Sequence, residues 1–374
     1  MDEIKQSQKA GEGANQFQAG TVTVNNTFVG ITEQRAREIY YSEMAPMIRA
    51  LAVEAQNVAT KRMLDLFSDL MARVKKCEKD LSSFSDPGFL QNVRIAQESA
   101  AVSERKEDIE TLSELLIDRM NGNISGCRKT GIRRAMEVVP ELEECELVVL
   151  AVMFFSIIYT CLDMSAINVE QYLSALDGKL ASILSICKLP YDTRYLQHLS
   201  ILDCVEINHA SSFRKLEDYY AEEIDGIICA GVAKGSPEHQ TVMKILDECD
   251  VGYNVLVAND LLPGYDRLPL VQLNYFSNLT IPAPDIQHVA SMAINKKNVE
   301  GLRKAISLYE RDDVLLKKVK DLVARQMDKY DSIRQFRYWL ARQDYKFELT
   351  PIGEALAYAI IRRCIPDMPT FILN

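Results

Sequence analysis

The residues most often used for metal and phosphate chemistry do not fall into a functional spacing in this chain. Its four histidines, His198, His209, His239 and His288, stand apart, and none belongs to a metal-binding pattern such as H-E-x-x-H. The run Gly231-Val-Ala-Lys-Gly235 resembles a phosphate-binding loop, but it lacks the Gly-Lys-Ser/Thr ending and follows no evident strand. We therefore interpret it as a loop between helices.

Carboxylates and nucleophiles give an equally weak indication of catalysis. Glu222, Glu223 and Asp225 form an acidic cluster, but no matching base or metal ligand accompanies them. Such clusters are usually solvated helix faces. No G-x-S-x-G nucleophile motif is present. The sequence therefore predicts a protein that is not an enzyme, with no catalytic, cofactor-binding or metal-binding residue and no cofactor. An enzyme with a site of unfamiliar sequence is the weakest alternative.

Charge and cysteine usage restrict the partners and the compartment. The 374 residues include 43 basic and 53 acidic ones, and the net charge of −10 repels nucleic acid on average. The nine cysteines are spread singly without a C-x-x-C, and several lie in apolar runs. We expect them to be small buried hydrophobes in a reducing compartment. Because the N-terminus also lacks an apolar signal region, the sequence predicts a cytoplasmic protein.

In chain order, the first predicted element is a short strand within residues 15–30. Its apolar and polar residues alternate, and no charge lies between Gln16 and Thr32. The strand has no evident partner within its own sequence, so a second copy of the chain is the simplest source of hydrogen bonds. The alternative is a tail that is disordered or packs on its own domain. The residues predicted to mediate oligomerisation are Phe17, Gln18, Val22, Val24, Asn25, Asn26 and Phe28.

A long helical region is predicted from Thr32 to about Leu81. One apolar stripe runs through most of it, and Pro46 should kink or divide it. The length suggests a helical stalk or an αα-hairpin arm. The stripe consists of Ile48, Leu51, Ala55, Val58, Leu66, Leu70 and Val74.

The most apolar segment, Leu147 to Leu162, predicts a buried helix. Its 16 residues are fewer than the ~20 that a membrane-spanning helix needs, and acidic residues flank it on both sides. We therefore expect no constitutive membrane insertion. A helix that is released to form a pore is the alternative.

Shorter elements complete a mainly α prediction. We expect strands at Val205–Ile207, Phe347–Leu349 and Thr370–Leu373, helices at Tyr219–Val232 and Pro351–Cys364, and a loop-rich, partly β region at 252–284. The predicted fold is a multi-helix scaffold with a long N-terminal helical region, a short N-terminal β-strand and a small α+β C-terminal part. The predicted domains are 1–31, a flexible leader with a β-strand assembly motif; 32–190, a helical domain; 191–295, a mixed α and loop region; and 296–374, a C-terminal helical domain with short β-strands.

Three short motifs resemble those of a family of uncharacterised bacterial proteins of similar length. The first is Gln18-Ala19-Gly20 with Asn25 and Gly30, the second is Leu115-Leu116-Ile117-Asp118-Arg119, and the third is Phe347-Glu348-Leu349-Thr350 with Gly353. The N-terminal part is also similar to short motifs that head bacterial immune-type effectors, and the C-terminal part resembles the ends of some abortive-infection proteins. These resemblances imply an assembling protein in antiviral defence, and they supply no catalytic residue.

The sequence thus predicts a self-associating scaffold or effector that assembles through its N-terminal strand. A second copy is the expected partner, and a protein with a similar N-terminal motif is another candidate. Two rivals remain from other classes. A nucleic-acid-binding regulator would use residues 296–343, which hold 13 basic and 7 acidic residues, although nucleic acid is not favoured. A membrane-permeabilising effector would use the apolar helix at 147–162.

Overall fold

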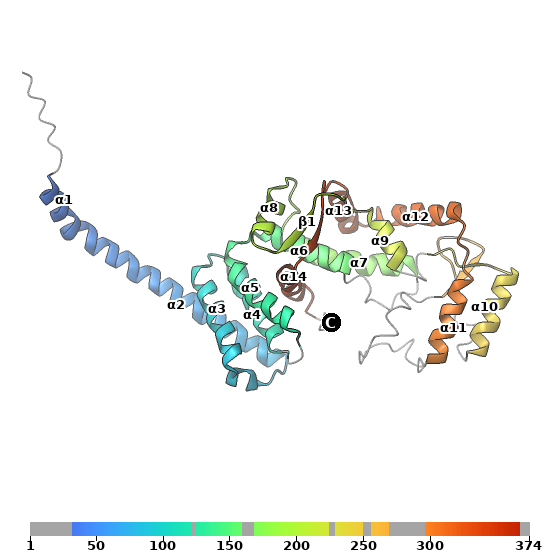
Figure 1. Cartoon of the computed structure of the whole chain (residues 1–374), viewed down its shortest axis with the longest axis horizontal. Coiled ribbons are helices and arrows are strands. Elements are labelled where there is room, and N and C mark those ends of the chain that lie inside the picture. The colour runs from blue at the N-terminus through green and yellow to red at the C-terminus, as the bar shows by residue number, and fades with distance from the viewer. Residues whose placement is uncertain are drawn as a thin grey trace, which may run out of the picture. The chain divides into compact units, whose positions relative to one another are not determined.

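A computed structural model describes residues 32–121, 124–158, 168–223, 229–249, 256–268 and 296–366 (Figure 1). The described chain is mainly α-helical with a few short strands, which confirms the predicted fold class. It divides into two compact units, Met1–Asn57 and Val58–Asn374. The predicted division into domains stays a prediction.

In the smaller unit, one wide turn interrupts the helical stretch. Helix α1 (Glu33–Ile39) leads into a π-helical turn (Tyr40–Met44), and α2 (Ala45–Lys76) follows directly. The backbone N–H of Ala45 donates to the carbonyl of Tyr40, five residues earlier. Pro46 explains this turn, because a proline ring crowds the carbonyl four residues before it and carries no N–H of its own. The prediction that Pro46 divides this region is confirmed.

In the larger unit, the second half of α2 begins a helical core. Leu66, Leu70 and Val74 are buried there, as the apolar stripe predicts. Capping residues set the starts of the next helices: Asp86 accepts from the N–H groups of Gly88 and Phe89, and Ser125 accepts from Arg128. The elements that follow are a 3₁₀ turn (Leu81–Ser85), α3 (Pro87–Val102), α4 (Lys106–Arg119), α5 (Gly126–Val138) and a 3₁₀ turn (Val139–Glu141).

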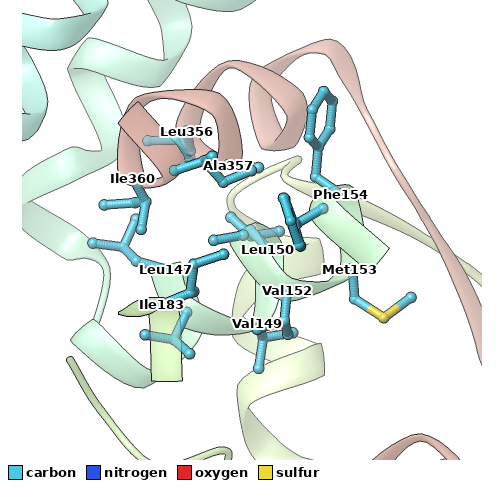
Figure 2. Close-up of a cluster of buried hydrophobic side chains, with 14 of the residues drawn as sticks. Leu147, Val149, Leu150, Val152, Met153, Phe154, Ile183, Leu356, Ala357 and Ile360 are labelled. Carbon is cyan, nitrogen blue, oxygen red and sulfur yellow. The ribbon is translucent and has the colours of Figure 1, made fainter. Parts of the chain in front are cut away.

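The predicted buried helix lies at the centre of this core. Helix α6 (Glu144–Met153) continues into a π-helical turn (Phe154–Ile158), and every residue from Leu147 to Ser156 is buried. Figure 2 shows Leu147 and Leu150 facing Leu356, Ala357 and Ile360 of α14 (Pro351–Cys364), with Ile183 of α7 (Val169–Leu184) nearby. The prediction of a buried helix is therefore confirmed for residues 147–156. Residues 159–162 lie outside the described part of the chain.

Two small antiparallel sheets complete the larger unit. Strand β1 (Val205–Asn208) pairs with β5 (Lys346–Leu349), and Val205 lies opposite Leu349. This confirms the strands predicted at 205–207 and 347–349. The second sheet has the order β2–β4–β3, formed by β2 (Val232–Ala233), β4 (Tyr265–Arg267) and β3 (Val257–Ala258).

Two predictions around residue 230 were wrong. The predicted helix Tyr219–Val232 ends early, because α9 spans Leu216–Glu223 and Val232 is in β2. The run from Gly231 to Gly235 also contains a strand, where none was expected. Gly231 and Gly235 both have positive φ angles, +79° and +80°, which suit a turn on either side of a two-residue strand. Hydrophobicity alone did not distinguish a buried strand this short from helix.

The remaining helices pack around these elements. Helices α10 and α11 form a second, smaller hydrophobic cluster with β2, which includes Val232, Val242, Leu246 and Leu302. Helix α10 was not predicted, although Ser236 caps it and Pro237 opens it. These helices are α8 (Arg194–Ile201), α10 (Pro237–Glu248), α11 (Lys296–Ser307), α12 (Asp313–Met327) and α13 (Asp331–Leu340).

Candidate functional site

The residues predicted to mediate oligomerisation, Phe17 to Phe28, lie outside the described part of the chain. So does the predicted strand Thr370–Leu373. Their roles therefore stay predictions. The structure instead draws attention to the helical segment that follows the strand region.

We call the helical residues 33–57 the arm. None of the side chains described in this segment is buried. Large apolar side chains on it are nevertheless about half exposed or more: the exposed fraction is 61% for Met47, 48% for Ile48 and 53% for Leu51. Tyr41 is 72% exposed, and its ring makes an edge-to-face contact with Tyr40. Such exposure of consecutive apolar turns is typical of a surface that another molecule covers.

Five exposed apolar residues of the arm form a stripe along one face. Met44, Ile48, Leu51 and Ala55 follow one another at intervals of four, three and four residues, and Met47 borders them. This spacing keeps side chains on one side of a helix. We call these five residues the arm stripe. Val53, which is 58% exposed, lies on the opposite face of α2 because it is two residues from Leu51. The arm stripe is thus a defined surface with a matched control position.

Charged residues of the core form a buried network. Glu114 of α4 contacts Arg73 of α2, and the Arg362 guanidinium of α14 lies 3.1 Å from its carboxylate. Burial lowers the pKa of Arg362, but Glu114, Tyr358 and Cys77 together outweigh this effect and raise the pKa overall. One turn later, Asp118 accepts hydrogen bonds of 3.3 and 3.0 Å from Arg128. The network ties α2, α4, α5 and α14 together.

This network explains the Leu115–Arg119 motif in structural terms. Leu115, Leu116 and Ile117 are buried, and Asp118 is the carboxylate that neutralises Arg128. The Arg128 guanidinium also stacks over the ring of Tyr358, 5.4 Å from its centroid. The motif therefore fixes the packing of α4 against α5 and α14.

The C-terminal motif is a joint between a strand and a helix. Phe347 and Leu349 belong to β5, and Thr350 caps α14 by accepting from the N–H groups of Ile352 and Gly353. The Thr350 hydroxyl also donates to the Asp203 carbonyl at 2.5 Å. Gly353 lies so close to the Cys204 carbonyl oxygen that a Cβ would overlap it. The motif is thus a capping turn on a two-stranded ribbon.

His198 and His239 each form a hydrogen bond through the ring with a single carboxylate. His198 lies 2.8 Å from Glu146, and His239 lies 3.0 Å from Asp266. Among the residues that the structure describes, no group of three or more metal-binding side chains comes together. A pocket of about 760 Å³ between α5, β1 and the start of α14 is lined by Thr130, Asp203 and Glu206 among others.

The cysteines are less buried than predicted. Cys204 is buried, and burial raises the pKa of its thiol to about 12. Cys127 is exposed, and the others in the described ranges are partly exposed. The prediction of buried hydrophobes was wrong for Cys127, whereas Cys77, Cys187, Cys229, Cys249 and Cys364 are partly buried and pack against the hydrophobic clusters.

Basic residues of the C-terminal helices are partly used in internal ion pairs. Arg337 of α13 contacts both Glu217 and Asp328, and Lys320 contacts Asp218 at 3.3 Å. These ion pairs therefore neutralise part of the excess positive charge that the sequence places in residues 296–343. This observation weakens the nucleic-acid alternative.

The Glu217–Arg337 pair predicts part of the acid sensitivity of the fold. Burial raises the pKa of Glu217, but the hydrogen bonds of 3.0 and 3.2 Å from Arg337, a backbone hydrogen bond and the charges of Arg337 and Lys215 together outweigh it and lower the pKa overall. A carboxylate with a lowered pKa in the folded state stabilises above about pH 4.3, and this contribution is lost as the pH falls through the lower folded value. We expect Glu217→Gln to reduce the acid-induced fall of the urea midpoint between about pH 6 and pH 3.

Glu98→Gln is the control for this prediction. Glu98 forms an ion pair with Arg94 in which both side chains are more than half exposed. Glu98→Gln should leave the pH dependence of the urea midpoint close to that of the original chain, because exposed ion pairs contribute little to stability. An equal acid-induced fall for Glu217→Gln and the original chain would show that the Arg337 pair does not stabilise the fold.

The described residues thus define a mainly α-helical protein with an exposed apolar arm. Residues 30–372 match the model of an uncharacterised family whose description reads ":-like", and the chain belongs to that family. The matched range includes the arm, whereas residues 15–29 precede it. No curated protein and no solved structure matches the chain. In the described residues, no helix combines the length and apolar content needed to cross a membrane.

Proposed function

We propose that the protein is a non-enzymatic scaffold or effector that assembles from copies of itself through its N-terminal region. The exposed arm stripe is the observation that carries this proposal. Most helical stability in proteins comes from packing of an apolar face rather than from helix propensity. Since none of the described side chains of the arm is buried by the described residues, we propose that a partner supplies that packing.

The strength of such an assembly follows from the size of the stripe. Fully burying a Leu, Ile or Met side chain contributes roughly 1.5–3 kcal/mol, and less when the side chain is already half covered. Association itself costs about 4–15 kcal/mol. Two stripes of five residues therefore support a weak, concentration-dependent pair. The predicted strand at residues 15–30 would add a second contact beside the first.

The biological setting is proposed from resemblance. The similarity of the N-terminal part to immune-type effectors and of the C-terminal part to abortive-infection proteins supports a role in antiviral defence in the bacterial cytoplasm. Burial of residues 147–156 argues against a permanently inserted pore. The absence of a catalytic motif supports a scaffold over an enzyme.

Substitutions in the arm stripe test this function. We expect the double variant Ile48→Asp with Leu51→Asp to lower the average mass in light scattering to that of a single chain, 42.3 kDa, because two charges would be placed in the apolar contact. Val53→Asp introduces the same residue on the opposite face of α2 and should leave the mass of the original chain unchanged. If the double variant keeps the mass of the original assembly, the arm does not mediate it.

A further inference from the structure

We propose that the arms of two copies pair side by side in parallel and in register. This inference rests on the proposed self-association and specifies its geometry. The arm stripe has the spacing of a two-stranded coiled coil, in which core positions alternate at intervals of four and three residues. Met44, Ile48, Leu51 and Ala55 occupy these positions. Each would meet the same residue of the second copy.

The residues that border the stripe favour the parallel arrangement. Ala45 and Ala52 lie along one edge, and Met47 and Glu54 lie along the other. In a parallel pair, opposite edges of the two helices face each other, so Met47 packs beside Ala52 of the second copy. In an antiparallel pair centred on the stripe, like edges meet, and Met47 lies beside the charged Glu54. Parallel pairing keeps this carboxylate away from the apolar contact.

The chain that precedes the arm gives an independent argument. Residues 1–31 are joined to the start of α1, so parallel arms bring the two leaders to the same end of the pair. In-register stacking of like strands, which the sequence predicts for residues 15–30, requires this proximity. Antiparallel arms would place the two leaders at opposite ends of the pair, separated by the length of one arm. The parallel arrangement therefore makes the two predicted contacts compatible.

The charge of the arm distinguishes a second copy from a lipid surface. Residues 33–57 contain four acidic and three basic residues. Helices that lie on membranes usually carry a polar face rich in lysine and arginine, which attracts anionic lipids. The arm lacks such an excess. A second copy of the arm is thus the better match for the stripe.

Cysteine cross-linking of the full chain tests the parallel register. Ile48→Cys and Ala55→Cys are introduced separately, and the disulfide-linked dimer is measured on non-reducing gels after mild oxidation. These positions are two helical turns apart, so an antiparallel pair cannot bring both to their own counterparts. We expect each variant to give roughly tenfold more dimer than Val53→Cys, which is on the opposite face, and than the original chain with its native thiols.

The outcomes separate this inference from the proposed function. If light scattering gives an average mass greater than that of one chain, but cross-linking occurs at only one position or at neither, the parallel register is overturned. Self-association would still be supported. A mass of one chain at every concentration would overturn both. Binding of a single-chain species to vesicles that contain anionic lipid, without cross-linking at either position, would assign the stripe to a lipid surface and overturn the pairing.

Discussion

Asp118→Ala is expected to lower the free energy of unfolding by about 3–5 kcal/mol, because it leaves a buried guanidinium without its carboxylate. Asp118 is 3% exposed and lies 3.0 Å from Arg128, whose side chain is 9% exposed. The Arg128 charge cannot reach bulk water without moving α5 away from α14. Urea unfolding at neutral pH measures the loss as a fall in the midpoint with an unchanged slope.

A double variant distinguishes the effect of the two charges on stability from the effect of the volume that the two side chains fill. Combining Asp118→Ala with Arg128→Met removes both charges and keeps an unbranched apolar chain in place of the arginine stem. We expect the double variant to be more stable than Asp118→Ala alone, because no unpaired charge stays buried. If the double variant were less stable than the single one, packing of the arginine stem would outweigh its charge.

Gly353→Ala is the second large effect that we expect, with a loss of about 3 kcal/mol. A Cβ at this position would overlap the carbonyl oxygen of Cys204, which is backbone and already accepts the N–H of Thr350 at 3.1 Å. Relief would require the start of α14 to move away from β1. Thermal unfolding of the full chain measures this change.

At Gly178, the same change from glycine to alanine is expected to have the opposite effect on stability. Gly178 is within α7, and a Cβ there would meet nothing within 4 Å. Alanine is the better helix former by about 1 kcal/mol, so this variant should be slightly more stable than the original chain. Equal effects at Gly353 and Gly178 would show that the close approach to Cys204 does not constrain the joint.

Much of the fold could be predicted from local sequence patterns. The apolar segment that begins at Leu147 indicated a central helix, and Thr350 followed by Pro351 indicated the start of α14. These signals are contained in neighbouring residues. Helix α10 was missed although Ser236 and Pro237 form a similar start signal. Strand β2 was missed because two residues are too few to show a period.

The buried ion network could not be predicted, because its members are far apart in the sequence. Arg73 and Arg362 both contact Glu114, and only the packing of α2 and α14 on α4 brings them together. A partial signal was present: Glu114 and Asp118 are four residues apart, and the three residues between them are apolar. Carboxylates at such positions predict buried cations, although not which ones.

The arm stripe shows a different limit of sequence analysis. Ile48 and Leu51 continue the apolar pattern that also contains Leu66 and Leu70. In the structure, Leu66 and Leu70 are each 1% exposed, whereas Ile48 and Leu51 are about half exposed. A periodic pattern predicts that a face is covered, but not whether the same chain covers it. The exposed half is therefore where a second copy is proposed to bind.

The mass of the intact chain in solution tests self-association most directly. Light scattering of the full-length protein should give a mass that rises with concentration from 42.3 kDa to a multiple of that value. The rise is expected because weak contacts between arms follow mass action. A constant mass of 42.3 kDa at all concentrations up to the limit of solubility would contradict the proposal.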